Sequence, residues 1–341
     1  MSKPTSNRPR LYTTLLSDSI QGITEQVSVY SMIILDEITL RTPDALMSGA
    51  TCEQIIQNCC PDIKLDNLLL CDVQHLLANI KVASSGMNID MYINCPKCNT
   101  SDPYEFDLSK TINLLSSSKW NTPLPITFDN NLILIYFKCP LYKDWNKYAI
   151  ADFKLRKQIY TISKLESQEG YEELLLSLIE KQRNLLNSFN SQSIIKVIVS
   201  NNCEVNEPKF IKEWYNQIDV SLQNKINDYI ASANKQCSLP DMNIICSSCN
   251  HNFVVPIDLD FCSQFRNKII PLNENEIIDM ISKMDKECKS ITSELLKLVW
   301  YMRGSISYSD SYYLTVHERE TIVKIIQENI ETSKKVGYPI I

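Results

Sequence analysis

The feature that most constrains this chain is a short cysteine-containing segment that occurs twice. Residues 90–99, DMYINCPKCN, align without a gap with residues 241–250, DMNIICSSCN. In the first copy the residues before the Cys-x-x-Cys turn alternate apolar and polar, and YEFDL alternates again after it, which is typical of two strands. Asp107-Leu108 and Asp258-Leu259 then match at the same offset. We therefore predict one hairpin, made of a strand, a knuckle and a strand, at two places in the chain.

Three chemistries use a Cys-x-x-Cys pair: a disulfide, a redox couple and a metal site. The polar start MSKPTSNRPR predicts no secretory signal, and a reducing cytoplasm disfavours disulfides. A redox pair usually lies at a helix N-terminus, whereas these pairs are flanked by strand patterns. Thiolates from Cys95, Cys98, Cys246 and Cys249 would supply the tetrahedral shell that suits one structural zinc. Two unrelated surface turns with free thiols are the alternative, and His251 is an alternative ligand.

The long separation of the two knuckles predicts how the chain is divided. Closing such a loop costs about 4 to 5 kcal/mol, whereas a structural zinc contributes roughly 10 to 16 kcal/mol. The site is therefore feasible, and the residues between the knuckles should form an insertion. We predict a flexible N-terminal arm at 1–10, a discontinuous core domain at 11–110 and 238–341, and a mostly helical insertion domain at 111–237.

The predicted fold class is α+β: mainly helical, with small antiparallel β-hairpins forming a discontinuous zinc-ribbon-like four-cysteine site. The stretch SVYSMIILDEITLR has strand character, and PITF with LILIYF forms a second type of hairpin around the turn DNN. Thr42 should cap a helix that starts at Pro43, and Thr315 with Glu318 forms a capping box. Further helices are predicted at 71–84, 146–165, 170–189, 207–216, 219–234, 274–286, 290–303, 308–313 and from 316.

Composition and motifs argue against several functions. The three histidines fall in no catalytic signature, and the six glycines form no nucleotide-binding pattern, so we do not predict an enzyme. A net charge of −6 makes nucleic acid an unfavourable partner. The longest apolar run, LILIYF, is far too short to span a membrane.

Two stretches carry a resemblance to a known family. The run LRTPDALMSGATCEQIIQNCCPDI, followed by CDVQHLLANIKVASSGMNIDMYINCPKC, resembles the baseplate hub and hub-assembly proteins of T-even-type contractile-tailed bacteriophages. The closing stretch from LVWYMRGS to the C-terminus is similar to the same group, so the resemblance covers roughly 28–110 and 238–341. It implies a non-catalytic structural or assembly role, in the host cytoplasm during assembly and then in the virion tail baseplate. The implied partners are other hub and tail proteins, and a homo-oligomer in the assembled baseplate is allowed.

Residues 295–341 are predicted to dock onto a neighbouring tail protein. The segment is rich in aromatic residues, the class enriched at interface cores, and ends in an apolar tip that a lone monomer gains little by exposing. A helical hairpin that packs on its own core is the alternative. The predicted contact residues are Tyr301, Tyr312, Tyr313, Tyr338, Ile340 and Ile341. For the whole chain, the alternative function is a zinc-ribbon nucleic-acid-binding or regulatory factor, whose binding would weaken steeply with salt.

Overall fold

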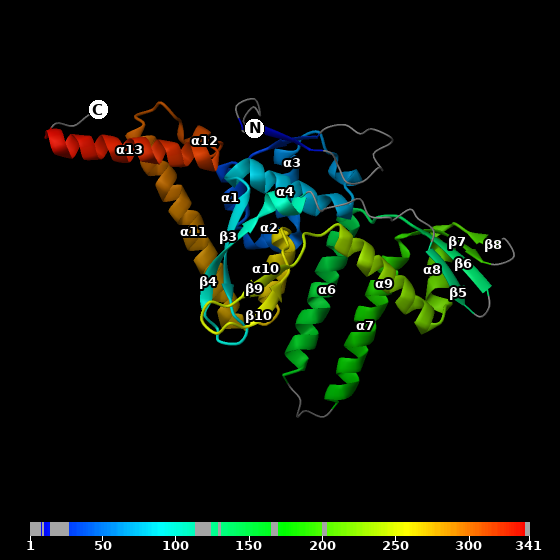
Figure 1. Cartoon of the computed structure of the whole chain (residues 1–341). Coiled ribbons are helices and arrows are strands. Elements are labelled where there is room, and N and C mark those ends of the chain that lie inside the picture. The colour runs from blue at the N-terminus through cyan, green and yellow to red at the C-terminus, as the bar shows by residue number, and fades with distance from the viewer. Residues whose placement is uncertain are drawn as a thin grey trace.

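The computed structural model describes residues 8, 10–13, 27–112, 124–128, 131–164, 170–199 and 203–337. These residues are mainly helical, with three two-stranded sheets and one four-stranded sheet, and every strand pair is antiparallel. The predicted α+β class, mainly helical with small antiparallel hairpins, is confirmed. Figure 1 shows a central body with an arm on one side and a sheet-containing lobe on the other.

The central body is built around two helices, α3 and α4, which carry many of its buried side chains. Its elements are β1 (Arg10–Thr13), β2 (Val27–Tyr30), α1 (Ile34–Thr39), α2 (Pro43–Ser48), α3 (Ala50–Cys59), the 3-10 helix η2 (Leu65–Asn67), α4 (Leu70–Ser85), α5 (Leu108–Ile112) and α10 (Phe261–Ile269). Thr42 and Pro43 start α2 as predicted. Gly49, with φ +84°, turns the chain directly from α2 into α3, and a Cβ there would collide with the Asn146 side chain. Glycine is therefore required at this turn.

The N-terminal segment departs from two predictions. Of the stretch predicted as strand, only its start belongs to β2, and α1 follows because the Asp36 carboxylate accepts a hydrogen bond from the Ile33 amide at 3.0 Å. Within the predicted arm, 1–10, Arg8 is buried, and its guanidinium donates to the carbonyls of Ser31 and Asn58. The other residues before Arg10 lie outside the described residues.

The two predicted cysteine hairpins are both present and both packed on the central body. They pair β3 (Asn88–Asn94) with β4 (Ser101–Asp107), and β9 (Met242–Ile245) with β10 (Asn252–Val255). At their bases the matched pairs Phe106-Leu108 and Ile257-Leu259 are buried in one apolar cluster together with α3, α4 and α10. The repeat in the sequence therefore corresponds to two hairpins rooted side by side in one core.

The part of the chain that lies between the two hairpins in the sequence includes a lobe with a second apolar cluster. Its sheet has the order β5-β6-β7-β8, made of β5 (Leu124–Phe128), β6 (Asn131–Phe137), β7 (Ile194–Val199) and β8 (Cys203–Val205). Buried residues from α8 (Pro208–Gln217) and α9 (Val220–Gln236) join those of the sheet. The hairpin β5-β6 was predicted, whereas β7 and β8 were not, because IIKVIV lies between long helical patterns.

The helices α6 (Tyr142–Ile162) and α7 (Tyr171–Ser191) form a hairpin beside the lobe (Figure 1). Although α6 follows β6 in the chain, its Tyr142 and Phe153 belong to the cluster of the central body. Lys157 Nζ also donates to the carbonyls of Ile269 and Ile270 at 3.1 Å. The first of the two helices is thus packed on the body rather than on the sheet of the lobe.

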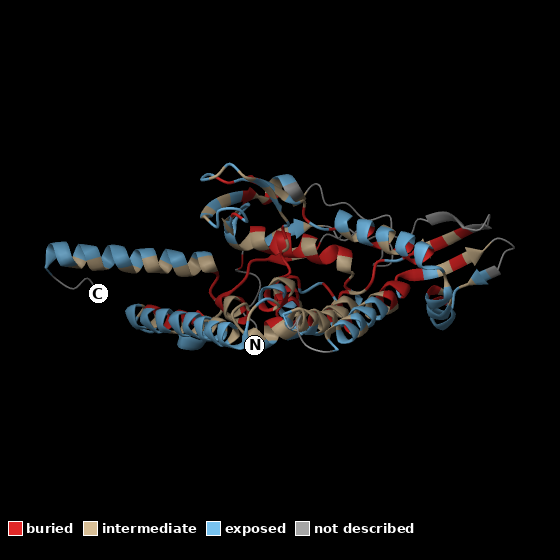
Figure 2. Cartoon of the chain, turned by 90° about the horizontal axis from the view of Figure 1, so that it is seen from below, coloured by how far each residue is buried: buried red, intermediate tan, exposed pale blue. Residues whose placement is uncertain are grey.

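The C-terminal arm consists of α11 (Glu274–Tyr301), α12 (Tyr308–Ser311) and α13 (Val316–Val336). The prediction of two helices at 274–286 and 290–303 was wrong: α11 is continuous, because neither glycine nor proline interrupts it and its apolar spacing continues through Cys288. The Thr315–Glu318 capping box is as predicted, and α13 ends at Gly337, whose φ is 75°. Figure 2 shows α13 projecting from the buried centre of the molecule, mostly exposed.

Candidate metal centre

Each cysteine knuckle is closed by the same two backbone hydrogen bonds. In the first, the amide of Asn99 donates to the carbonyl of Cys95, and the amide of Cys95 donates to the carbonyl of Thr100, both at 2.9 Å. The second knuckle repeats both bonds at the matching positions, each at 3.0 Å. Asn99 and Asn250 both adopt positive φ, of 60° and 55°, which asparagine tolerates better than most residues. The two turns are therefore the same structure formed twice.

The four predicted ligands come together at the point where the hairpins meet. The sulfurs of Cys95 and Cys249 are 3.6 Å apart, and those of Cys98 and Cys246 are 3.5 Å apart. All four sulfurs lie within 4.8 Å of one another. With zinc–sulfur bonds of about 2.3 Å, tetrahedral ligands would be separated by about 3.8 Å. Each close pair joins one hairpin to the other, and the four cysteines lie close enough to bind a metal.

Burial and charge differ among the four thiols. Cys95 and Cys246 are buried, Cys249 is half-buried and Cys98 is exposed. The pKa of Cys98 is lowered to about 6, first by the hydroxyl and backbone of Thr100 and then by the neighbouring thiols. For Cys249 the His251 backbone favours the thiolate, but desolvation and the other three thiols outweigh it and raise the pKa to about 12. The neighbouring thiols therefore help to stabilise the thiolate of Cys98 and destabilise that of Cys249.

Direct bonds between the hairpins are few and polar. The Ser247 hydroxyl donates to the Asp102 carboxylate at 2.5 Å, and the Tyr104 hydroxyl to the Ile245 carbonyl at 3.4 Å. His251, the alternative ligand, is not among the clustered donors, and its ring stacks on Phe253 with the centroids 6.0 Å apart.

The predicted partner-binding residues do not form one group. Tyr301 is 52% exposed at the end of α11, whereas Tyr312 packs partly against the apolar cluster at the base of the arm. Tyr313 is half-buried. The remaining three, Tyr338, Ile340 and Ile341, lie outside the described residues.

Sequence reasoning missed two features of the arm. Trp300 is 80% exposed, beside Tyr301, although it was not selected as a contact residue. Along α13, Ile322, Ile326 and Ile330 follow one another at four-residue spacing on one face, and none is buried. That spacing was visible in the sequence, but spacing alone cannot show that a face is left uncovered.

Among the described residues, no helix is long and apolar enough to cross a membrane. A family model described as "T4 bacteriophage base plate protein" matches residues 24–265, which is well over half of the chain and includes both knuckles. No curated protein and no solved structure matches the chain. The match begins after β1, covers the rest of the central body and the lobe, and ends within α10, so that the arm follows it. The chain therefore belongs to the T4 bacteriophage base plate protein family and is a structural protein of the phage baseplate.

Proposed function

We propose that this baseplate protein acts at the hub, with one zinc joining its two hairpins and with its C-terminal arm bound to a neighbouring tail protein. The binding of the arm to a neighbouring protein is supported by the uncovered apolar face of α13. The zinc is supported by the clustering of four thiols from two separate hairpins.

The zinc would supply cohesion that the hairpins otherwise lack. Beyond their buried bases, the strands expose large apolar side chains, including Tyr92 at 78% and Ile245 at 64%. Two-stranded hairpins of this size are marginal in water unless something else holds them. Cys95, Cys98, Cys246 and Cys249 would hold the ion, which would link the hairpins without any reaction.

The base of the arm is fixed, whereas most of α13 is not. Arg319 in the first turns of α13 pairs with Glu37 of α1 at 3.0 Å and with Glu294 of α11 at 3.7 Å. Ile322 still touches the apolar cluster at this base, but no residue of α13 is buried. A helix with one unburied apolar stripe is marginal alone in water, and such stripes commonly lie in a groove of a partner. We infer that Ile326 and Ile330 enter a groove on another baseplate protein.

The exposed aromatic pair at the end of α11 would extend the same contact. Trp300 and Tyr301 are followed by Arg303, whose φ of 50° is positive, and by Gly304 at φ 87°, where the chain turns away from α11. Tryptophan and tyrosine contribute more binding energy at interfaces than most residues. Their place at the bend leaves both side chains available to a partner.

The docking role is tested by adding charge to the apolar stripe. Ile326→Asp with Ile330→Asp should leave the melting temperature of the isolated protein nearly unchanged, because neither residue is buried. It should block incorporation into baseplates when the variant complements a phage that lacks the protein. The matched control, Thr321→Asp with Thr332→Asp, adds the same charge to the opposite, exposed face and should assemble normally.

Equal assembly of the two double variants would refute the docking role of α13. If the wild-type chain alone forms a dimer that only the isoleucine variant disrupts, the occupant of the stripe is a second copy and not a neighbouring protein. Placement at the hub is tested separately, by cryo-electron microscopy of the assembled baseplate, and density at the periphery would exclude it.

A further inference from the structure

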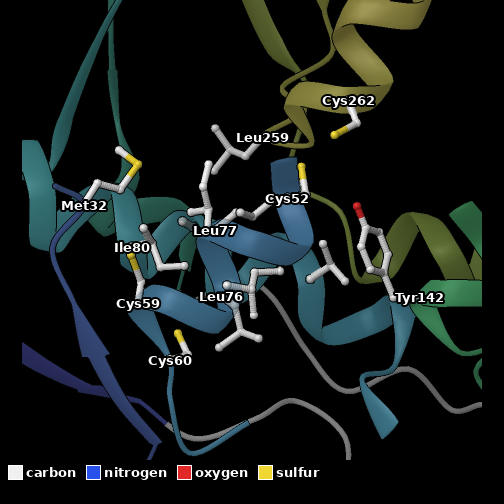
Figure 3. Close-up of a cluster of buried hydrophobic side chains, with 14 of the residues drawn as sticks. Met32, Cys52, Cys59, Cys60, Leu76, Leu77, Ile80, Tyr142, Leu259 and Cys262 are labelled. Carbon is white, nitrogen blue, oxygen red and sulfur yellow. The ribbon is translucent and has the colours of Figure 1, made fainter. Parts of the chain in front are cut away.

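A second group of potential metal ligands lies inside the central body, away from the hairpins. The sulfurs of Cys52 and Cys262 and a carboxylate oxygen of Asp260 all lie within 4.8 Å of one another, and all three residues are buried. Figure 3 shows the two sulfurs facing each other, with the Tyr142 hydroxyl on the same side. We propose that these residues form an inner site for zinc or a similar thiolate-binding divalent cation.

Three elements that are distant in the sequence build this site. Cys52 lies in the first turn of α3, Tyr142 is the first residue of α6, and Asp260 caps α10. The carboxylate is held by the amides of Cys262 and Ser263, each 3.0 Å from Oδ1. The orientation of Asp260 is therefore fixed before any ion binds, as a preorganised ligand requires.

The distances between donor atoms fit a small tetrahedral shell. The Cys52 sulfur is 3.2 Å from Asp260 Oδ1, and the Tyr142 hydroxyl oxygen is 3.4 Å from Asp260 Oδ2. Bond lengths of about 2.3 Å to sulfur and 2.0 to 2.2 Å to oxygen would separate sulfur and oxygen ligands by about 3.6 Å. The two thiolates and the carboxylate are zinc ligands by type, and the phenol oxygen lies beside the carboxylate as a further oxygen donor.

A buried positive charge lies one helical turn from the site and favours anionic ligands there. Arg266, one helical turn after Cys262 on α10, is only 2% exposed. Its guanidinium donates to the Met47 carbonyl and to Asn146 Oδ1 at 3.3 Å, and its Nη2 has no hydrogen-bond partner among the described residues. No carboxylate forms an ion pair with it in the part of the chain that the structure describes. A buried cation of this kind needs negative charge nearby.

Binding of the ion would leave the total buried charge unchanged. When a divalent cation binds, two S–H bonds break, two metal–sulfur bonds form, and two protons leave to water. The two positive charges of the ion replace those of the two protons, so no additional net charge is buried.

One member of the group lies at the edge of a pocket. Asp260 forms part of the wall of a pocket of 360 Å³, together with Gln74, Trp145 and Asp258. Leu239 and Cys237 also line this pocket, so an ion would enter the shell past Asp260. An entry path to a buried shell is one of the requirements for a credible metal site.

The test measures the metal content of the full-length protein and of two matched cysteine variants. Wild-type protein purified in the presence of zinc should carry about two equivalents, and Cys262→Ser should lower this by about one. Cys59→Ser is the control, because Cys59 is equally buried in α3 but belongs to neither group of ligands. It should retain the wild-type zinc content.

X-ray absorption at the zinc edge keeps the proposal testable if Cys262→Ser fails to fold. Wild-type protein with both sites filled should show oxygen as well as sulfur around zinc. A single equivalent with sulfur ligands alone, lost in Cys246→Ser, would overturn the inner site and leave a hydrogen-bonded thiol–carboxylate group in its place. A single equivalent that is lost in Cys262→Ser and kept in Cys246→Ser would instead support the inner site and refute the zinc joining the hairpins.

Discussion

The two cysteine groups of this protein are alike in chemistry and opposite in setting. The knuckle group lies where two surface hairpins meet, and one of its sulfurs is exposed. The inner group lies among α3, α6 and α10, and its members are buried, with Asp260 at the wall of a pocket. A metal would therefore have different tasks in the two places, namely holding two surface hairpins together in the first and joining the starts of α3 and α10 inside the core in the second.

The difference follows from what each group retains when no ion is bound. Without metal, the hairpins retain their buried bases and a few polar bonds to each other, such as that from Ser247 to Asp102. The inner group retains the carboxylate cap of α10, the hydrogen bond from Cys52 to Asp260 and the apolar contacts of Leu76 and Leu259. We therefore expect the stability of the hairpins to depend much more on metal than the stability of the central body does.

The largest expected effect is that of Cys246→Ser. This change removes a buried ligand, and structural zinc sites contribute roughly 10 to 16 kcal/mol in small domains. We expect loss of about one equivalent of zinc and much faster hydrogen exchange in β3, β4, β9 and β10, with α4 still protected. Exchange measured by mass spectrometry checks this. Cys288→Ser, at a half-buried position outside both groups, is the control.

Unchanged exchange in the hairpins of Cys246→Ser would contradict the comparison. It would mean that the buried bases, Phe106 with Leu108 and Ile257 with Leu259, hold the hairpins without help. The same measurement also tests the proposed division of the chain, because an insertion domain at 111–237 should keep its own exchange pattern when the hairpins open.

A smaller effect is expected for Tyr142→Phe at the inner group. The hydroxyl is removed while the ring, which is 2% exposed, remains packed. Loss of one buried hydrogen bond to a carboxylate should lower the free energy of unfolding by about 1.5 to 3 kcal/mol. Urea denaturation of the variant and the wild type gives this difference. A change below about 0.5 kcal/mol would show that the phenol does not contribute to this group.

The sequence alone predicts the two cysteine hairpins, because the residues that determine each hairpin are neighbours in the chain. A Cys-x-x-Cys turn between alternating strands specifies its own geometry, and the repeat indicated that the two copies belong together. Helix caps such as Thr315 with Glu318 were predictable for the same reason. The continuity of α11 was missed although it is local: residues 287–289 were left between two predicted helices, but neither glycine nor proline interrupts the stretch.

The inner group could not be predicted, because its members share no local pattern. Cys52 lies in a helical stretch, Asp260 and Cys262 follow the second hairpin, and Tyr142 belongs to the sequence between the two hairpins. Only the packing of α3, α6 and α10 brings them together. The strands β7 and β8 were missed for a related reason, since β7 acquires its pairing from β6, more than fifty residues earlier in the chain.

The smallest effect should distinguish the two knuckles themselves, which differ at several matched positions, among them that of Thr100 and His251. Thr100 follows the first knuckle, and its hydroxyl is 3.3 Å from the Cys98 sulfur, whereas His251 at the equivalent place stacks on Phe253. We expect His251→Ala to change the free energy of unfolding by no more than about 0.5 kcal/mol and to leave the zinc affinity unaltered. Thr100→Ala should weaken zinc binding measurably, because the hydroxyl that lowers the pKa of Cys98 is lost. Competition with a coloured chelator measures both affinities, and a weaker site in His251→Ala would make the imidazole a ligand after all.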